Sequence, residues 1–281
     1  MFFYVFGSYS LLYSEEKVSF DKSLAKPSAR FDHKIFADAQ QDIVIVHGGK
    51  SSSSGEGLRD TWLFDLGSRT WIQLPDAPDY ATDAAFEDGT LYTITGLSEV
   101  SSEIHVLKIG HTEAERKAST ASWQTISFPT NGLIPGPRPR EGSALIPVTT
   151  GYGRQYLLYL FGCRQEGTAS EESKERSPFF SDIWTYQLPA KSAKPTSWTD
   201  FKPAVVKDVI REKLGFDSGG HSWGEVEVQA SEQGGHEGKV HPGPRGFFGA
   251  DVMEDGHRVV LWGGINPREE KENDGWIVSL S

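Results

Sequence analysis

Three arginines have the side chain and the sequence position expected of a binding site. Arg30, Arg140 and Arg245 each end a Pro-x-x-Arg tetrapeptide, and each stands just before a segment predicted to be a strand. A guanidinium is a planar fork of N–H donors that pairs with a carboxylate or a phosphate through two hydrogen bonds. If the tetrapeptides occupy one position of a repeat, the three arginines converge at one end of the molecule, where they can bind an anion together.

Neighbouring residues enlarge this candidate site. His33, Arg138, Phe247 and Phe248 lie within three residues of the arginines. We therefore expect a positive, aromatic-lined mouth suited to a carboxylate, an acidic peptide or an anionic small molecule. In the alternative interpretation, each arginine is structural and bonds carbonyls or carboxylates of the neighbouring repeats. Four acids are near enough in the repeat to be such partners: Asp32, Asp60, Asp65 and Asp182.

Two further sets of residues lack the spacing that their chemistry requires. Gly49-Lys50-Ser51 matches the end of a phosphate-binding loop, but Val44 stands where its first glycine belongs, and no helix is predicted to follow. His221, His236 and His241 lie in a segment rich in Gly, Ser and Glu without the paired spacing of a zinc site, which favours a solvated loop. The sequence predicts no catalytic residue, no metal and no cofactor.

The elements that must position these residues form a repeat of strands. One copy reads DIVIVHGG, a polar loop, TWLFDL and then TWIQLP, a pattern typical of antiparallel strands separated by turns. The order returns as TLYTITG with IHVLKI and Trp123, as YLLYLFG with DIWTYQL and Trp198 or Trp223, and as RVVLWGG with GWIV. A weaker copy, FYVFGS, opens the chain. The first turn glycines, Gly7, Gly48 and Gly96, are 41 and 48 residues apart, close to the roughly 40 to 50 residues of a propeller blade.

With these motifs the chain resembles the kelch family of β-propellers, whose repeat has an apolar strand, a Gly-Gly pair, a Tyr or Trp in the third strand and a Trp in the fourth. It is similar to the single-domain kelch proteins of filamentous fungi, and this resemblance implies an all-β ring of six four-stranded blades. Three of the five copies depart from the doublet, as Gly7-Ser8, Gly96-Leu97 and Gly162-Cys163, and Ala81 replaces the arginine in one copy.

Five blade signals, against the six that the family implies, predict a propeller that is incompletely closed. The last copy stops after its third strand, and a propeller usually completes its last blade with a strand from the other end of the chain. That strand would come from Leu11–Phe20, which the first blade already needs. We therefore expect a propeller shortened at its N-terminus.

We expect residues 1–281 to form a single kelch β-propeller domain, because a repeat array folds as one unit. A rim insertion is predicted at 199–222, where Val206, Val209, Ile210 and Leu214 have helical spacing and Gly215 is a stop signal. This short helix either caps an apolar part of the rim or shapes a partner or ligand site.

Composition narrows the partners. The chain has 28 Lys and Arg against 39 Asp and Glu, a net charge of −11 without a basic cluster, so we expect no nucleic-acid partner. A lone Cys163 and the absence of an N-x-Ser/Thr sequon indicate a reducing, cytoplasmic location. The opening apolar stretch is too short to cross a membrane. We expect a monomer.

Galactose oxidase has a kelch-type propeller, and that resemblance implies a copper site with a cysteine cross-linked to a tyrosine. Cys163 stands at the second position of a glycine doublet beside an apolar strand, where we expect it to pack as a small hydrophobic residue.

Two functions from different classes remain open. The first is a binding scaffold that presents a loop-rich propeller face to a protein partner, which the fold supports by analogy alone. The second is a non-redox cyclase or isomerase, or an accessory protein, that acts on a small molecule in specialised-metabolite biosynthesis. Such catalysis works by positioning and leaves little trace in a sequence.

Overall fold

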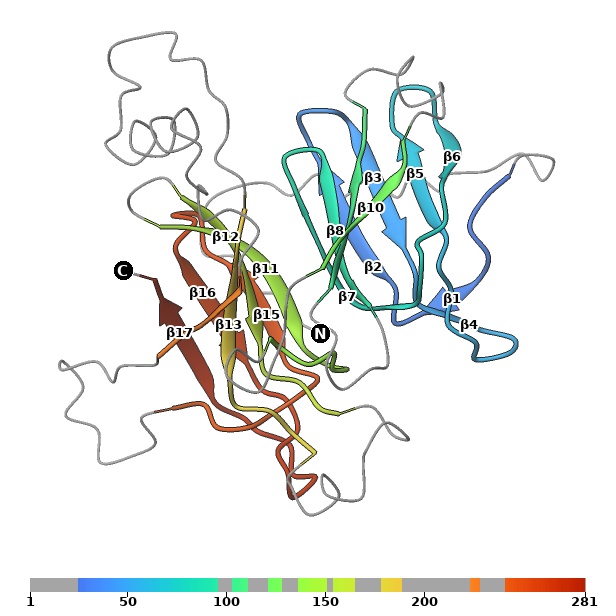
Figure 1. The fold of residues 1–281 in the computed structure, drawn as a ribbon. Helices are drawn as coiled ribbons and strands as arrows, with labels where there is room; N and C mark the ends of the chain where they lie inside the picture. Colours follow the sequence, from blue (N-terminus) through green and yellow to red (C-terminus); the bar gives the residue numbers. More distant parts are fainter. Residues whose placement is uncertain are drawn as a thin grey trace, which may run out of the picture.

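The computed structural model describes residues 25–95, 103–110, 121–127, 136–150, 154–164, 178–188, 223–227 and 241–280. All regular structure in these ranges is β-strand, so the prediction of an all-β fold is confirmed. Four antiparallel sheets are arranged as the blades of a β-propeller (Figure 1). In each blade the spatial order of the strands follows the order of the chain.

Blades 1 and 2 each have four strands. Blade 1 consists of β2 (Lys34–Asp38), β3 (Ile43–His47), β5 (Thr61–Asp65) and β6 (Thr70–Leu74). Blade 2 consists of β7 (Ala81–Glu87), β8 (Thr90–Thr95), β9 (Ile104–Lys108) and β10 (Trp123–Ile126). A short ladder of β1 (Arg30–Phe31) and β4 (Lys50–Ser51) stands beside blade 1.

Blades 3 and 4 complete the described part. Blade 3 consists of β11 (Ala144–Thr149), β12 (Gln155–Leu160), β13 (Ile183–Gln187) and β14 (Trp223–Glu225). Blade 4 consists of β15 (Gly249–Val252), β16 (Arg258–Trp262) and β17 (Gly275–Ser279). Of the two tryptophans predicted to open the fourth strand of blade 3, Trp223 does so. The first blade signal, at Gly7, and the insertion at 199–222 lie outside the described residues.

The first strand of each blade contacts the first strand of the next. β2 lies against β7, β7 against β11, and β11 against β15. Figure 1 shows blades 1 and 2, in blue to green, on one side and blades 3 and 4, in green to red, on the other. Within the described ranges no hydrogen-bonded strand pair joins blade 4 to blade 1, so hydrogen bonds do not close the ring.

Apolar side chains between adjacent blades form the core. Ile45 and Leu63 of blade 1 pack with Leu91 and Leu107 of blade 2, and all four side chains are fully buried. A second cluster joins blades 2 and 3, and a third joins blades 3 and 4. Blades 2 and 3 thus bury both faces against their neighbours, because a single blade cannot shield its apolar residues from water. Blade 4 packs on blade 3 and also has exposed apolar side chains, among them Trp262 at 64% and Ile277 at 60%.

The turn after β3 needs glycine at its second position. Gly49 has φ +88°, and a Cβ there would lie 2.6 Å from the carbonyl oxygen of Phe31. Gly55, in the same loop, has φ +73° but nothing within 4 Å of such a Cβ. An alanine at Gly55 therefore loses stability only through the backbone conformation, whereas an alanine at Gly49 loses stability through the backbone conformation and a steric clash.

We expect Gly55→Ala to lower the free energy of unfolding by about 1 kcal/mol, because an L-residue disfavours this backbone region. Gly49→Ala should cost roughly 1 to 3 kcal/mol more, because its methyl group also forces β1 to move. Urea denaturation of the two variants measures the difference. An equal loss of unfolding free energy in the two variants would contradict the close approach of β1 to this turn.

His47 ends β3 as a buried imidazole between blades 1 and 2. Its side chain is 1% exposed, Nδ1 lies 2.9 Å from the Thr61 hydroxyl, and its ring centroid is 5.7 Å from that of Trp123. Burial lowers the pKa of His47 from 6.5 to about 4. The folded protein thus keeps His47 neutral at pH values where the unfolded chain protonates it.

A depressed histidine pKa makes stability fall with acidification. The contribution of His47 is complete above pH 6.5 and is lost as the pH falls towards 4, by about 1.4 kcal/mol per pH unit. We expect His47→Gln to flatten this part of the stability curve, as measured by urea denaturation between pH 7 and 4. An unchanged slope would contradict a buried, neutral His47.

Candidate functional site at the propeller mouth

The three predicted arginines lie where the first strands of blades 1, 3 and 4 begin, and each pairs with an aspartate that precedes the third strand of the same blade. Two nitrogens of Arg30 donate to the two carboxylate oxygens of Asp60, both at 2.7 Å. Arg140 and Arg245 bond Asp182 and Asp274 in the same two-pronged way. The bonds to carboxylates that the structural interpretation expects are present, but within each blade rather than between blades.

A main-chain carbonyl completes each of these pairs. One of the guanidinium nitrogens that bond the aspartate also donates to the carbonyl of the residue directly after the second strand, at 2.9 to 3.1 Å. The acceptors are Gly48, Phe161 and Gly263. Each arginine therefore ties three consecutive strands of its blade together, and we call this arrangement the arginine clamp.

Burial and electrostatics hold the clamp in its charged form. The side chains of Arg140 and Arg245 are 0% exposed. Burial alone raises the pKa of Asp182, but the hydrogen bonds and charge of Arg140, with the indole N–H of Trp184, bring it below its ordinary value. The pKa of Asp60 is likewise lowered, because bonds from Arg30 and Trp62 outweigh burial.

The other predicted site residues have different positions. Arg138 contributes its carbonyl oxygen, which accepts a hydrogen bond from Arg140 Nε at 2.9 Å. His33 is exposed and packs close to Gly49. Phe247 is 58% exposed, whereas Phe248 is half-buried and packs edge-on against Phe161. The structure thus brings the arginines to one end of the propeller with their forks already paired, and their binding of an external anion stays a prediction.

Blade 2 has no clamp, because Ala81 replaces the arginine, and a different charged group stands at this level. Asp83 is 1% exposed, and its carboxylate contacts residues from the two neighbouring blades. Lys34 Nζ of blade 1 lies 2.6 Å from one oxygen, and the Ser143 hydroxyl beside blade 3 donates to the other at 2.9 Å. The charge of Asp83 raises the pKa of Lys34 more than burial lowers it. This group links blades 1, 2 and 3.

The exposed surface at this end carries both signs of charge and two aromatic rings. Lys50 Nζ lies 3.6 Å from Glu141 and 3.8 Å from Asp32. Phe31 pairs with Lys50 across the β1–β4 ladder and is 46% exposed. The N–H of Phe247 donates to the carbonyl of Gly142, the neighbour of Glu141, at 2.8 Å. We call Phe31, Asp32, Lys50, Glu141 and Phe247 the mouth face.

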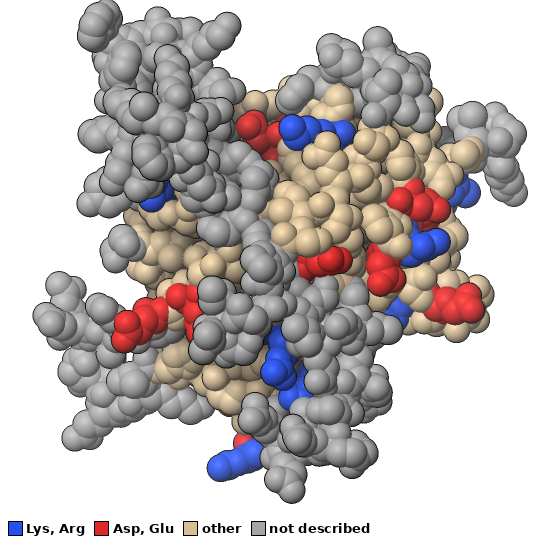
Figure 2. Space-filling model, viewed as in Figure 1, with Lys and Arg blue, Asp and Glu red and all other residues tan. Residues whose placement is uncertain are grey.

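Phe247 has a backbone conformation that its side chain disfavours, with φ +58°. The corresponding residues of blades 1 and 3 are Asp32, at φ +55°, and Gly142, at φ +62°. A bulky residue at positive φ stores strain, and such strain concentrates at functional positions. In the view of Figure 2, basic and acidic side chains lie next to one another on the described surface instead of gathering by sign.

The described residues offer no metal centre. They contain no group of three or more His, Cys, Asp or Glu placed to hold an ion. Burial raises the pKa of the Cys163 thiol to about 11, and its Sγ contacts the carbonyl of Glu141 at 3.5 Å. A thiol in this state is a poor nucleophile and ligand. Of the three histidines considered for zinc, only His241 is described, and its Nδ1 accepts a bond from the N–H of Gly243.

Sequence reasoning missed the groups that join different blades. Lys34, Asp83, Ser143 and Glu141 belong to no motif, and Lys50 was considered only as part of Gly49-Lys50-Ser51. The one local signal was the replacement of arginine by Ala81, which marks blade 2 as the exception.

Comparisons with known proteins add no functional assignment. No family model matches the chain, and no curated protein matches it. Among solved structures it is similar to the structure of YjhT, with 11% sequence identity and a TM-score of 0.49 over 92% of this chain and 68% of that one. The assignment of a propeller fold therefore rests on the arrangement of the four blades in this structure. No helix in the described ranges is long and apolar enough to cross a membrane.

We expect Arg140→Ala to lower the free energy of unfolding by about 3 to 5 kcal/mol, because it breaks a buried ion pair. Arg258→Ala is a matched control, since it removes an arginine paired with Asp255 on the surface and should have little effect. Urea denaturation at pH 7 measures both. Similar small losses would contradict a structural role for the clamp.

Proposed function

We propose that this chain is a kelch-type propeller that acts as a binding scaffold and engages a protein partner through its mouth face. The observation that carries the proposal is the exposure of Phe31 and Phe247, at 46% and 58%, on a surface held by clamped strands. Aromatic side chains are enriched among the residues that dominate binding energy in protein interfaces. Here they flank the opposite charges of Lys50 and Glu141.

The chemistry of the mouth face favours a protein over a small anion. The guanidinium groups of Arg140 and Arg245 are buried at this end and bonded to carboxylates. Binding an external anion there would therefore require one of these ion pairs to break. The groups at the surface are instead two exposed rings, the exposed Asp32, and the half-buried Lys50 and Glu141. A partner of matching chemistry inserts an apolar side chain beside the rings and places charges opposite Lys50 and Glu141.

The kelch assignment is part of the proposal. It is supported by the positive φ angles of Gly48 and Gly49, and of Gly263 and Gly264. Tryptophans of the third strand bond the clamp aspartates in blades 1 and 3. A cytoplasmic location fits the single, buried Cys163.

The second function, action on a small metabolite, has one structural argument. Asp83 is a buried carboxylate beside the mouth, and buried titratable groups concentrate at active sites. Both of its oxygens are, however, engaged by Lys34 and Ser143, and its side chain is 1% exposed. We therefore place partner binding first.

We expect the double variant Phe31→Ser and Phe247→Ser to lose a partner that the unchanged chain retains. The measurement is affinity capture from an extract of the source cells with quantitative mass spectrometry. Ile277→Ser is the matched control, because Ile277 is 60% exposed on the third strand of blade 4.

A protein recovered by the unchanged chain and the control, but at least tenfold less by the double variant, supports the proposal. Equal recovery by all three overturns it, provided that their thermal melts coincide.

A further inference from the structure

Blade 4 has no fourth strand among the described residues. The third strands of blades 1, 2 and 3, which are β5, β9 and β13, each pair with a fourth strand on their outer side. β17 is the third strand of blade 4 and its outermost described strand (Figure 1). The outer edge of β17 is therefore open to a further strand within the described part of the chain.

The fourth strands of blades 1 to 3 make one common contact. Each third strand has five residues, and its fourth residue lies opposite a tryptophan of the fourth strand. These pairs are Phe64 with Trp71, Leu107 with Trp123 and Tyr186 with Trp223. In β17, which also has five residues, the fourth residue is Val278. The repeat thus defines a position for an aromatic ring opposite Val278.

Apolar residues beside Val278 can receive such a ring. In blade 3 the ring of Trp223 packs on that of Tyr186, with centroids 5.2 Å apart, against the core cluster between blades 2 and 3. In blade 4 Trp276 and Leu280 flank Val278 on the same face of the strand, and both pack on the cluster between blades 3 and 4. A ring opposite Val278 therefore extends an existing core.

The backbone of β17 offers hydrogen bonds to a further strand. The N–H of Gly263 donates to the carbonyl of Asp274, and the N–H of Leu280 donates to that of His257, at opposite ends of the β16–β17 ladder. Hydrogen-bonded and non-hydrogen-bonded pairs alternate along an antiparallel ladder. The residues that direct their N–H and C=O groups away from β16 are therefore Gly275, Ile277 and Ser279.

This edge lacks the side chains that usually protect an edge strand. β17 contains no charged residue and no proline, although such residues commonly block pairing with another chain. The Ile277 side chain is 60% exposed. In blade 1 the equivalent Leu63 is fully buried and lies opposite Ile72 of the fourth strand. An aliphatic residue opposite Ile277 covers apolar surface in the same way.

We propose that β17 binds an extended segment of a partner protein, which adds to blade 4 as an antiparallel fourth strand with a tryptophan opposite Val278 and an aliphatic residue opposite Ile277. In this mode of recognition, main-chain hydrogen bonds supply affinity and alternate side chains supply specificity. Blade 1 already uses this chemistry in β6, whose sequence is TWIQL. The site lies outside the mouth face and does not rest on the proposed function.

The sequence favours a second molecule as the source of the strand. Leu11–Phe20, the segment of this chain predicted to complete the last blade, contains no tryptophan and is also needed by the first blade. Trp71, Trp123 and Trp223 already pair within their own blades. A partner segment with a tryptophan followed by an aliphatic residue therefore fits the edge better than the chain's own N-terminal segment.

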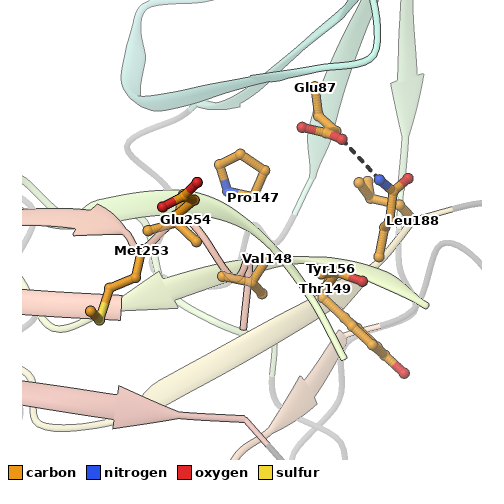
Figure 3. A pocket seen from close by; sticks show the side chains of 11 residues that line it. Glu87, Pro147, Val148, Thr149, Tyr156, Leu188, Met253 and Glu254 are labelled. Carbon is orange, nitrogen blue, oxygen red and sulfur yellow. Dashed lines mark hydrogen bonds between the residues drawn. The ribbon is translucent and has the colours of Figure 1, made fainter. Parts of the chain in front are cut away.

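The open edge is separate from a cavity of about 380 Å³ at the end of the strands opposite the mouth. The 11 residues drawn in Figure 3 line this cavity, and they belong to blades 2, 3 and 4 but include none of β17. The side-chain amide of Gln155 donates to Glu87 Oε1 at 2.8 Å, across the junction of blades 2 and 3 (Figure 3). A strand on the outer edge of β17 therefore does not fill this cavity.

The probe for the edge is a fluorescently labelled peptide with the sequence RTWIQLP, residues 69–75, which contains β6. Fluorescence anisotropy measures its binding to the unchanged, full chain. We expect saturable binding. A peptide with serine in place of the tryptophan should bind about tenfold more weakly, because it cannot bury an aromatic ring beside Val278.

Two N-methylated peptides test the strand pairing without any change to the protein. In the proposed register the peptide isoleucine lies opposite Ile277 and directs its N–H at β17, whereas the N–H of the following glutamine points away. N-methylation of the isoleucine should weaken binding by about tenfold or more, because a backbone hydrogen bond is lost. N-methylation of the glutamine should have little effect.

A variant of the chain locates the binding. Ile277→Pro removes an N–H that faces the open edge, where a strand tolerates proline, and should abolish binding. Ile277→Ala keeps that N–H and should bind about fivefold more weakly at most. If the thermal melt of Ile277→Pro shows a loss of folding, the two methylated peptides decide. The proposal is overturned if RTWIQLP does not bind, if the two methylated peptides bind alike, or if a folded Ile277→Pro binds like the unchanged chain.

Discussion

The pairing of a buried arginine with an aspartate of its own blade is the interaction on which the mouth of the propeller depends. In blades 1, 3 and 4 it joins the start of the first strand, the turn after the second and the start of the third. A buried guanidinium is stable only when carboxylate and carbonyl acceptors satisfy it. The clamp therefore fixes where these three strands begin and end, and with them the loops at this end.

Blade 2 shows what happens when that pairing is absent. Ala81 brings no charge, and Asp83 receives its cation from Lys34 of blade 1 and a hydroxyl from Ser143. In blade 2 the buried charge pair therefore joins residues of two different blades, whereas in blades 1, 3 and 4 it joins residues of the same blade. It couples three blades in a ring that strand hydrogen bonds do not close in the described part of the chain.

The mouth and the opposite end of the propeller have different chemistry because different kinds of residue form them. At the mouth, clamped strands support exposed rings and mixed charges, including a strained Phe247. At the opposite end, turns from blades 2, 3 and 4 leave an apolar cavity edged by acids. A rigid frame with variable loops allows one fold to present an extended surface and a concave pocket at once.

The sequence by itself determined the strands, the turns and the place of the arginines, since period-two hydrophobicity, glycine pairs and Pro-x-x-Arg act within a few residues. It also indicated Asp60 and Asp182 as partners of arginines. It did not indicate Asp274, and it did not show that each arginine pairs within its own blade. The position of an arginine in the repeat does not determine which of several nearby acids lies within hydrogen-bond distance after folding. Only the tertiary structure decided the contacts of Lys34 with Asp83, of Lys50 with Glu141 and of Gln155 with Glu87. These residues lie 49 to 91 positions apart and meet only when separate blades pack together.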